Sequence, residues 1–320
     1  KYVYYQPLAV ALHDEHGSFG GDTSVQLMQQ GQQTFSKIWK QELTLNHLPY
    51  GNTPYLKLRA ATRMHATKIL YVDQLLPRHK IGSGFARAGD NVQLMARAFD
   101  GDAIVTAIGN EEVLANVEPE LWTTLRQNQV ELQTHRCGAY AGRSCIRTAA
   151  STGRGGITCK SVQRHLHHRP GYYAFIVVSR PHVMERCAKY VSQYCNRFGC
   201  QIVYDAEALY HVRDILYEAF AEDNKGWFIP QEQRRNRDVN ATRARELSAM
   251  RYAHAVVTVS SNEQRQIQAA GVKAPVFVIG HVKDPSTDHQ LPFSERSGVL
   301  FVGAFPLAPL MALVPSARVA

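Results

Sequence analysis

Short apolar runs alternate with amphipathic segments along most of the sequence, from residue 68 to residue 279. Six runs have the length and continuous apolar character of buried strands: 68–73, 103–108, 173–179, 201–205, 255–260 and 276–279. Several are followed by apolar residues at helical spacing. Continuous apolar strands that alternate with helices are typical of a parallel sheet covered on both faces. We therefore predict an α/β fold with a doubly wound parallel sheet.

The first 66 residues have a different pattern. Short strands are expected at 2–5 and 9–12, followed by a helix that Thr23 or Ser24 caps. The apolar face of this helix carries Val25, Met28, Phe35, Ile38 and Trp39. Three turn-forming residues and little periodicity make residues 46–66 typical of a linker. The expected organisation is a short α+β tail (1–45), the linker (46–66) and the α/β domain (67–305).

The charge of the protein is concentrated in one segment. The net charge of the 320 residues is +9, and residues 136–169 hold seven Arg and Lys and no Asp or Glu. This segment is rich in Gly, Ser and Thr and lacks a sustained apolar period, which predicts a solvated loop or insertion. Contact with nucleic acid or with anionic lipid headgroups is the alternative.

The six cysteines form no CxxC pair. Cys187, Cys195 and Cys200 lie at apolar positions, and we expect buried free thiols in a reducing compartment. Cys159 precedes histidines at positions 165, 167 and 168, but their spacing matches no zinc finger, and no metal site is expected. No signal peptide opens the chain, and no run approaches the roughly 18 apolar residues of a membrane span. These features predict a cytoplasmic protein.

A glycine-rich loop follows the first strand of the α/β domain. Gly82, Ser83 and Gly84 precede a helix that starts near Arg87. Glycines permit close approach of the backbone, and the start of a helix attracts anions, so the loop is a candidate phosphate site with Arg87 as a charged fork. The loop is neither a dinucleotide fingerprint, because Arg87 replaces the third glycine, nor a Walker loop. This argues against a dehydrogenase and a P-loop NTPase.

Polar residues also follow two later strands. Arg180 and His182 come after 173–179, and Asp205 and Glu207 end or follow 201–205. Ligands of open α/β sheets bind beyond the carboxyl ends of the strands, so we expect these residues and the glycine-rich loop to converge on one edge. The structural alternative is that these side chains satisfy strand-end carbonyls or cap the following helices.

These segments resemble the amino-terminal half of family 4-type glycosyltransferases. Those enzymes have a GT-B fold, in which two Rossmann-like domains face each other across a cleft. The resemblance covers roughly residues 67–305 outside the basic segment, and it rests on "KILYVD", "GSGFARAGDNVQLMARAF", "YYAFIVVSRPH", "QIVYDAEALYHVRD", "AHAVVTVSSNEQ", "VFVIGHVKDP" and "GVLFVGAF". It implies a Rossmann-like acceptor-side domain. Residues 306–320 would be the truncated start of the donor-binding domain.

The amino-terminal stretch is similar to a second family. "HDEHGSFGGD" resembles the motif that closes the active site of family 2, GT-A glycosyltransferases, and His13, Glu15 and Asp22 fit its pattern. His16 stands where that pattern has glycine. In such enzymes the matching histidine lies near a metal and the donor diphosphate. The resemblance therefore implies a divalent metal only for the preceding GT-A module, and a surface turn for His13 in this chain.

Together the two resemblances imply a fragment of a bacterial two-module glycosyltransferase, with no cofactor of its own. It would transfer a sugar from a nucleotide-sugar donor to a saccharide or lipid-linked acceptor in cell-surface polysaccharide synthesis. The fragment is expected to be inactive alone. Asp205 and Glu207 would line the acceptor side as base or hydrogen-bonding groups, with His182 as the competing base. Five residues would bind the donor phosphates or line the cleft: Gly82, Ser83, Gly84, Arg87 and Arg180.

These resemblances also bear on partners. We expect no specific nucleic-acid partner, and a cytoplasmic location with peripheral contact at the inner face of the cell membrane. The alternative function is a non-catalytic Rossmann-like binding module whose basic loop contacts nucleic acid or anionic membrane. The basic segment contains one aromatic residue, Tyr140, whereas single-stranded nucleic-acid sites interleave several aromatics with the charges.

Overall fold

The computed structural model describes residues 21–48, 54–79, 82–109, 118–133, 160–223, 238–281 and 293–295. The chain divides into two units, Lys1–Val282 and Lys283–Ala320. Of the second unit, only the short 3-10 helix η2 (Phe293–Glu295) is described. The first unit contains the sheet and the helices that pack on it.

The described residues form one parallel sheet of seven strands, in the order β3-β2-β1-β4-β5-β6-β7. The strands are β1 (Thr67–Asp73), β2 (Ala103–Gly109), β3 (Val130–Gln133), β4 (Phe175–Ser179), β5 (Gln201–Asp205), β6 (Ala255–Thr258) and β7 (Val276–Val278). The six predicted strands are confirmed as members of this sheet. β3 was not predicted, because its four residues, "VELQ", are half polar and pair only with β2.

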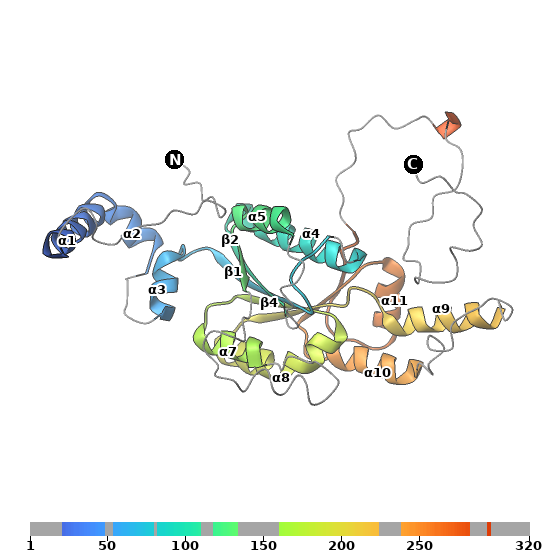
Figure 1. The fold of residues 1–320 in the computed structure, drawn as a ribbon. Helices are drawn as coiled ribbons and strands as arrows, with labels where there is room; N and C mark the ends of the chain where they lie inside the picture. Colours follow the sequence, from blue (N-terminus) through green and yellow to red (C-terminus); the bar gives the residue numbers. More distant parts are fainter. Residues whose placement is uncertain are drawn as a thin grey trace, which may run out of the picture. The chain divides into compact units, whose positions relative to one another are not determined.

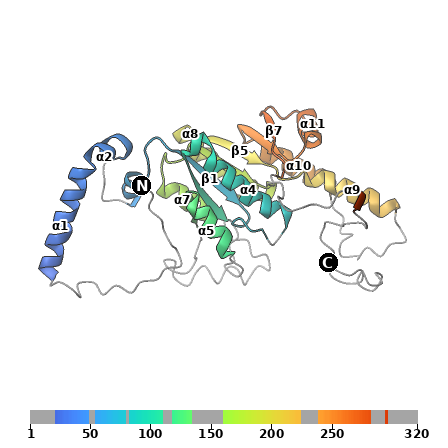
Figure 2. The same cartoon turned by 90° about the horizontal axis from the view of Figure 1, so that it is seen from above.

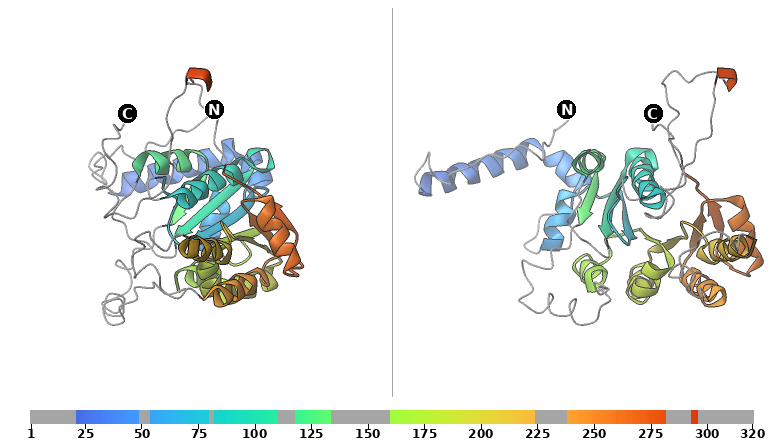
Figure 3. Two further views of the ribbon diagram at one scale, coloured as in Figure 1. Left: turned by 90° about the vertical axis from the view of Figure 1, so that its right-hand side faces the viewer. Right: turned by 45° about the vertical axis from the view of Figure 1, so that its right-hand side comes forward.

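Helices cover both faces of this sheet, as the doubly wound prediction requires (Figure 1). On one face, α4 (Ser83–Arg97) and α5 (Pro119–Gln127) pack over β1, β2 and β3. On the other face lie α7 (Lys160–His168), α8 (Pro181–Phe198) and α10 (Val239–Met250), as the right-hand view of Figure 3 shows. α9 (Tyr210–Asp223) packs on α10, and α11 (Ser261–Ala269) packs on β6 and β7.

Local sequence signals set several helix boundaries. Pro181 occupies the first turn of α8, where its missing N–H costs no hydrogen bond, and Gly199 ends the helix with a left-handed φ of 75°. Asp238 caps α10 by accepting the N–H of Ala241 at 2.8 Å. Ser260 caps α11 through the N–H of Glu263. These residues fix where α8 ends and where α10 and α11 begin.

The two faces of the sheet have separate cores. The α7–α8–α10 side buries a large cluster that includes Leu70, Ile176 and Tyr204. The α4–α5 side buries a smaller cluster that includes Tyr71 and Val105. Successive strand residues point to opposite faces, so neighbours such as Leu70 and Tyr71 contribute to different cores.

On the α4–α5 side of the sheet, side chains are less buried in the strands that follow β1 in the sheet order. In β4, β5 and β6, the residues that face α7 and α8 are buried, whereas those on the α4 side, such as Val177, Val203 and Val257, are only half-buried. In β7, Phe277 is 54% exposed. Seen from above in Figure 2, α4 and α5 lie over one side of the sheet. None of the described helices packs closely on this face over β5, β6 and β7.

The basic segment was predicted as a loop over 136–169, and this is wrong for its last ten residues. Lys160–His168 form α7, and Val162 and Leu166 are buried against α8 in the larger core. Arg169 is not a solvated charge, because it forms two 2.6 Å hydrogen bonds to the carboxylate of Glu131 on β3. Residues 134–159, with three of the cysteines, lie outside the described residues.

The predicted linker contains a helix, α3 (Pro54–Ala61), which begins at one of the prolines that suggested a linker. Proline is compatible with the first turn of a helix. His47 Nδ1 contacts the carbonyl of Ala60 at 2.8 Å, so the end of α2 lies beside the end of α3. Leu58 packs against the larger core.

The amino-terminal helix is confirmed as α1 (Gly21–Ile38), followed by α2 (Lys40–Asn46). Because α1 begins at Gly21, Thr23 and Ser24 lie inside its first turn, and the predicted cap is wrong. The residues of its apolar face are all exposed: Val25, Met28, Phe35, Ile38 and Trp39. The predicted strands at 2–5 and 9–12 lie outside the described residues.

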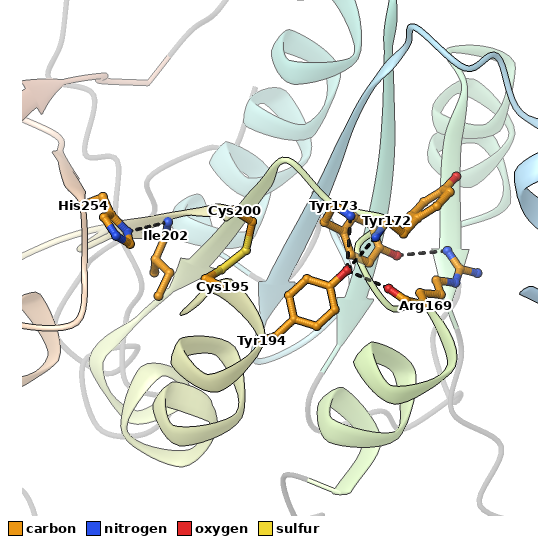
Figure 4. The surroundings of a disulfide bond; sticks show 8 residues. All are labelled: Arg169, Tyr172, Tyr173, Tyr194, Cys195, Cys200, Ile202 and His254. Carbon is orange, nitrogen blue, oxygen red and sulfur yellow. Dashed lines mark hydrogen bonds between the residues drawn. A yellow bond between two sulfur atoms is a disulfide. The ribbon is translucent and has the colours of Figure 1, made fainter. Parts of the chain in front are cut away.

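A disulfide between Cys195 and Cys200 joins the end of α8 to the residue before β5 (Figure 4). The prediction of free thiols is therefore wrong for these two residues. The chain turns at Gly199, between them, and this turn brings the two sulfur atoms together. Cys187 is a buried thiol, as expected. Beside the disulfide, the hydroxyl of Tyr194 accepts two backbone N–H groups and donates to the carbonyl of Arg169 at 2.6 Å.

Candidate functional site

The candidate site lies where three neighbouring strands end. β1, β4 and β5 are adjacent in the sheet, and their last residues bring Asp73, Ser179 and Asp205 to the same edge. Arg180 directly follows β4, and its N–H bonds the carbonyl of Asp205 at 3.0 Å. The glycine-rich loop and α4 begin at this edge as well, since they follow β1. This is the edge at which open α/β sheets bind ligands.

Gly84, Arg180 and Glu207 meet at one point of this edge. A Cβ atom added to Gly84 would lie 2.2 Å from Oε1 of Glu207 and 3.1 Å from Nη2 of Arg180. A side chain at position 84 would therefore require the carboxylate of Glu207 to move. The predicted convergence of the three segments is therefore confirmed for these residues.

Backbone strain accompanies this contact. Arg180 and Glu207 both have left-handed φ values, 75° and 58°, and Gly82 has φ of 128°. Non-glycine residues rarely adopt such values, and they cluster at functional sites. The N–H of Glu207 bonds Oδ1 of Asp205 at 3.2 Å, which holds the turn after β5 in this form. α9 begins only at Tyr210, so Glu207 lies before the first turn of this helix.

Arg180 is the central charge of the site. Its Nε donates to Oδ1 of Asp73 at 2.8 Å and its Nη1 to Oε2 of Glu207 at 3.3 Å, while its guanidinium lies 4.2 Å from the ring centre of Phe85. Burial alone lowers the pKa of Arg180, but the carboxylates of Asp73 and Glu207 outweigh it and raise the pKa. Nη2 is buried and has no hydrogen-bond partner in the described residues.

Asp73 and Tyr210 also belong to this cluster and were not predicted. Burial raises the pKa of Asp73 to about 6, although Arg180 opposes the shift. The hydroxyl of Tyr210 donates to Oε2 of Glu207 at 3.0 Å. Burial, with the charge of Glu207, raises the pKa of Tyr210 to about 12. Asp73 ends an apolar strand just as Asp205 does, so the same sequence signal was present for it.

The side chains of Arg87 and Asp205 form an ion pair with each other. Nη1 of Arg87 donates to both carboxylate oxygens of Asp205, at 3.0 and 2.8 Å. Nε and Nη2 of Arg87 donate to the carbonyl of Ile279, and Asn91 contacts the carboxylate at 3.4 Å. Both charges are almost completely buried. This pair ties α4 to the ends of β5 and β7.

The other predicted residues lie in the helices that begin near this cluster, in α1, or outside the described residues. Ser83 is the first residue of α4. His182 is half-buried in the first turn of α8, on the opposite face of the sheet from α4. Asp22 lies in the first turn of α1. His13 and Glu15 lie outside the described residues.

A hollow of about 260 Å³ opens beside the cluster on the α4 side of the sheet. Apolar side chains of α4 and of strands β1, β4, β5 and β6 line most of it, and Asp205 and Asn91 stand at one end. Among the described residues, no three His, Cys, Asp or Glu side chains come together as a metal site, and no helix is long and apolar enough to cross a membrane.

The charged groups at this edge pair with one another. Two guanidinium groups, Arg87 and Arg180, form ion pairs with three carboxylates, Asp73, Asp205 and Glu207. The start of α4 adds N–H groups that have no acceptor within the helix. Of the three carboxylates, Glu207 is the most accessible, with 17% of its side chain exposed.

No protein-family model and no curated protein matches this sequence. Among solved structures, the chain is similar to Glycyrrhiza uralensis UGT73P12 complexed with glycyrrhetinic acid 3-O-monoglucuronide. The identity is 10%, the TM-score is 0.40, and the match covers 67% of this chain and 49% of that one. A UDP-glucosyltransferase from Polygonum tinctorium capable of glucosylating indoxyl, in complex with 3,4-dichloroaniline, matches at 11% identity and a TM-score of 0.38, over 68% of this chain and 54% of that one. The chain spans about half the length of both.

Proposed function

We propose that this chain carries the acceptor-side domain of a glycosyltransferase. The observation that carries the proposal is the meeting of Gly84, Arg180 and Glu207 at the carboxyl edge of a parallel sheet. That edge combines a glycine-rich helix start, a buried guanidinium and a reachable carboxylate. The resemblance of the surrounding segments to family 4-type glycosyltransferases supports the same function.

The proposed reaction transfers a sugar from a nucleotide-sugar to a hydroxyl of a saccharide or lipid-linked acceptor. The acceptor oxygen forms a bond to the anomeric carbon, the bond from that carbon to the diphosphate oxygen breaks, and the hydroxyl proton passes to a base. Glu207 is the proposed base or acceptor ligand, with His182 as the competing base. The start of α4 and Arg180 stabilise the charge that develops on the diphosphate.

Asp205 and Arg87 have positioning roles in this proposal. Because they neutralise each other and are buried, neither contacts substrate directly. Asp205 fixes the turn that carries Glu207 through the 3.2 Å hydrogen bond, and Arg87 fixes Asp205. Two roles suggested by the sequence, Asp205 as base and Arg87 as phosphate fork, are thereby replaced.

The wider assignments are proposals too. We propose that residues 1–45 are the tail of a GT-A-like module, with His13, Glu15 and Asp22 in its closing motif, and that residues 67–305 form the GT-B domain. Polysaccharide synthesis at the inner face of the cell membrane would supply the lipid-linked or saccharide acceptor. A divalent metal would belong to the GT-A module alone.

Sugar transfer by a protein that contains this chain together with a donor-binding domain tests the proposal. Glu207→Gln should lower kcat by at least about 100-fold if Glu207 is the base, as expected for loss of general-base catalysis. Glu218→Gln, which removes the same charge from an exposed position on α9, should leave kcat unchanged. A loss in His182→Ala with no loss in Glu207→Gln would assign the base to His182. Full activity in both variants, or no transfer from any nucleotide-sugar, would refute the proposed function.

A further inference from the structure

The carboxylate of Glu207 occupies the place where an anion would approach α4. Its Oε1 lies against Gly84, the second residue of that helix, so closely that a Cβ there would be 2.2 Å away. Its Oε2 accepts from Arg180 and from Tyr210. The side chain thus joins the helix start to the guanidinium that would hold the same anion.

Two features independent of Glu207 indicate that this place suits an anion. α4 is 15 residues long, and the N–H groups of its first turn have no acceptor within the helix. Nη2 of Arg180, in a residue only 6% exposed, has no hydrogen-bond partner in the described residues and lies 3.1 Å from the Cβ position of Gly84. A buried donor without an acceptor is uncommon in native proteins, and an anion at this point would supply the acceptor.

We infer that Glu207 is an internal competitor: its carboxylate occupies this anion site in the free protein and competes with ligands for it. A ligand must carry more negative charge than one carboxylate to displace it. A monoanion offers the site no more charge than the carboxylate already does. A diphosphate carries more charge and more acceptor oxygens, and it can reach both the helix start and Nη2 of Arg180. The site therefore selects diphosphates over carboxylates and other monoanions. This inference rests on the proposed function, because it assigns the diphosphate of the donor as the displacing ligand.

The backbone around Glu207 keeps the competitor in place. Its left-handed φ of 58° is held by the hydrogen bond to Asp205 and by the 2.6 Å hydrogen bond from the N–H of Ala208 to the carbonyl of Ala206. Asp205 is in turn locked by Arg87. The carboxylate is therefore aimed at Gly84 by the fold, while its partial exposure lets it turn away from Gly84 when a ligand arrives.

Titration calorimetry of the 320-residue chain with inorganic pyrophosphate tests the inference. Glu207→Gln keeps the shape of the side chain and removes its charge, so we expect pyrophosphate to bind at least about tenfold more tightly than to the wild type. Glu218→Gln makes the same change of net charge on the exposed side of α9 and should alter the affinity less than twofold. Equal effects of the two variants would overturn the inference, because general repulsion would then explain both.

Two further variants locate the site. In Glu207→Ala, acetate should compete with pyrophosphate, because it can replace the removed carboxylate, whereas in the wild type acetate should not compete. Adding Gly84→Ala to Glu207→Gln should abolish the gain in affinity, because the new Cβ approaches Nη2 of Arg180 to 3.1 Å. Retention of the gain would place pyrophosphate elsewhere and overturn the inference. Circular dichroism checks that each variant is folded.

The calorimetry separates this inference from the proposed function, because no sugar is transferred in it. Tighter pyrophosphate binding by Glu207→Gln, with no sugar transfer by the larger protein, would uphold the competitor and refute the glycosyltransferase. Sugar transfer by the larger protein, with pyrophosphate affinity unchanged in Glu207→Gln, would refute the competitor alone.

Discussion

Replacing Asp205 by Asn removes one charge from a buried ion pair and leaves the other in place. The side chains of Arg87 and Asp205 are 1% and 3% exposed, so solvent screens neither charge. In Asp205→Asn the guanidinium would keep its hydrogen bonds to the carbonyl of Ile279 but lose its counter-charge. Breaking a buried pair in this way typically costs about 3–5 kcal/mol. That is a large part of the roughly 5–15 kcal/mol that stabilises most domains.

Urea unfolding followed by circular dichroism measures this cost, as a lower midpoint at an unchanged slope. Arg87→Met should cost a similar amount, because Asp205 is then the unpaired charge. In the double variant neither member of this pair remains charged. Its loss in free energy of unfolding should therefore be at least about 2 kcal/mol smaller than the sum of the two single-variant losses. As a control, Glu185→Gln removes one side of the exposed pair with Arg245 and should change stability by less than about 0.5 kcal/mol. Simple additivity in the double variant, or a cost of Asp205→Asn near that of the control, would refute the reasoning.

Three further predictions concern stability. Burial raises the pKa of Asp73 from an ordinary value of 3.8 to about 6, so its protonated form favours folding; this stabilisation is complete below the unfolded pKa of 3.8 and is lost as pH rises through 6. Compared with Asp73→Asn, the wild type should therefore lose about 2.5 kcal/mol between pH 4 and pH 7 in urea unfolding, and parallel profiles would contradict this. Tyr194→Phe removes the acceptor of two buried backbone N–H groups and should cost about 1–3 kcal/mol, seen as a lower Tm; an unchanged Tm would show that another group replaces the hydroxyl. Reduction of the disulfide between Cys195 and Cys200 opens only a short loop and should cost about 2 kcal/mol, with Cys200→Ser insensitive to reductant; a much larger loss would contradict the small-loop argument.

The sheet could be predicted from the sequence because each buried strand is a continuous apolar run. The edge strand β3 could not be predicted in this way. Two of its four residues are polar and only Val130 is fully buried, so it carries no continuous apolar run. α7 was hidden for a different reason. Its apolar contacts depend on only Val162 and Leu166, set among basic residues that resemble a solvated loop.

The meeting of the three candidate segments could be predicted because parallel strands end at one edge. The partners of the charged residues could not. Arg87 and Asp205 are separated by 118 residues, and nothing local shows that each neutralises the other. The contact of Glu207 with Gly84 likewise depends on the left-handed turn after β5, which the sequence "DAEAL" does not indicate, since it contains no glycine.

The partly covered apolar face of β5–β7 affects how a common folding probe should behave with this protein. The dye ANS brightens on apolar surface and is used to recognise molten globules. Here the native sheet itself presents Val177, Val203, Val257 and Phe277 to solvent or in half-buried positions. We therefore expect ANS to brighten already with the folded protein, so that partial unfolding is better followed by the near-ultraviolet signal of its packed tyrosines.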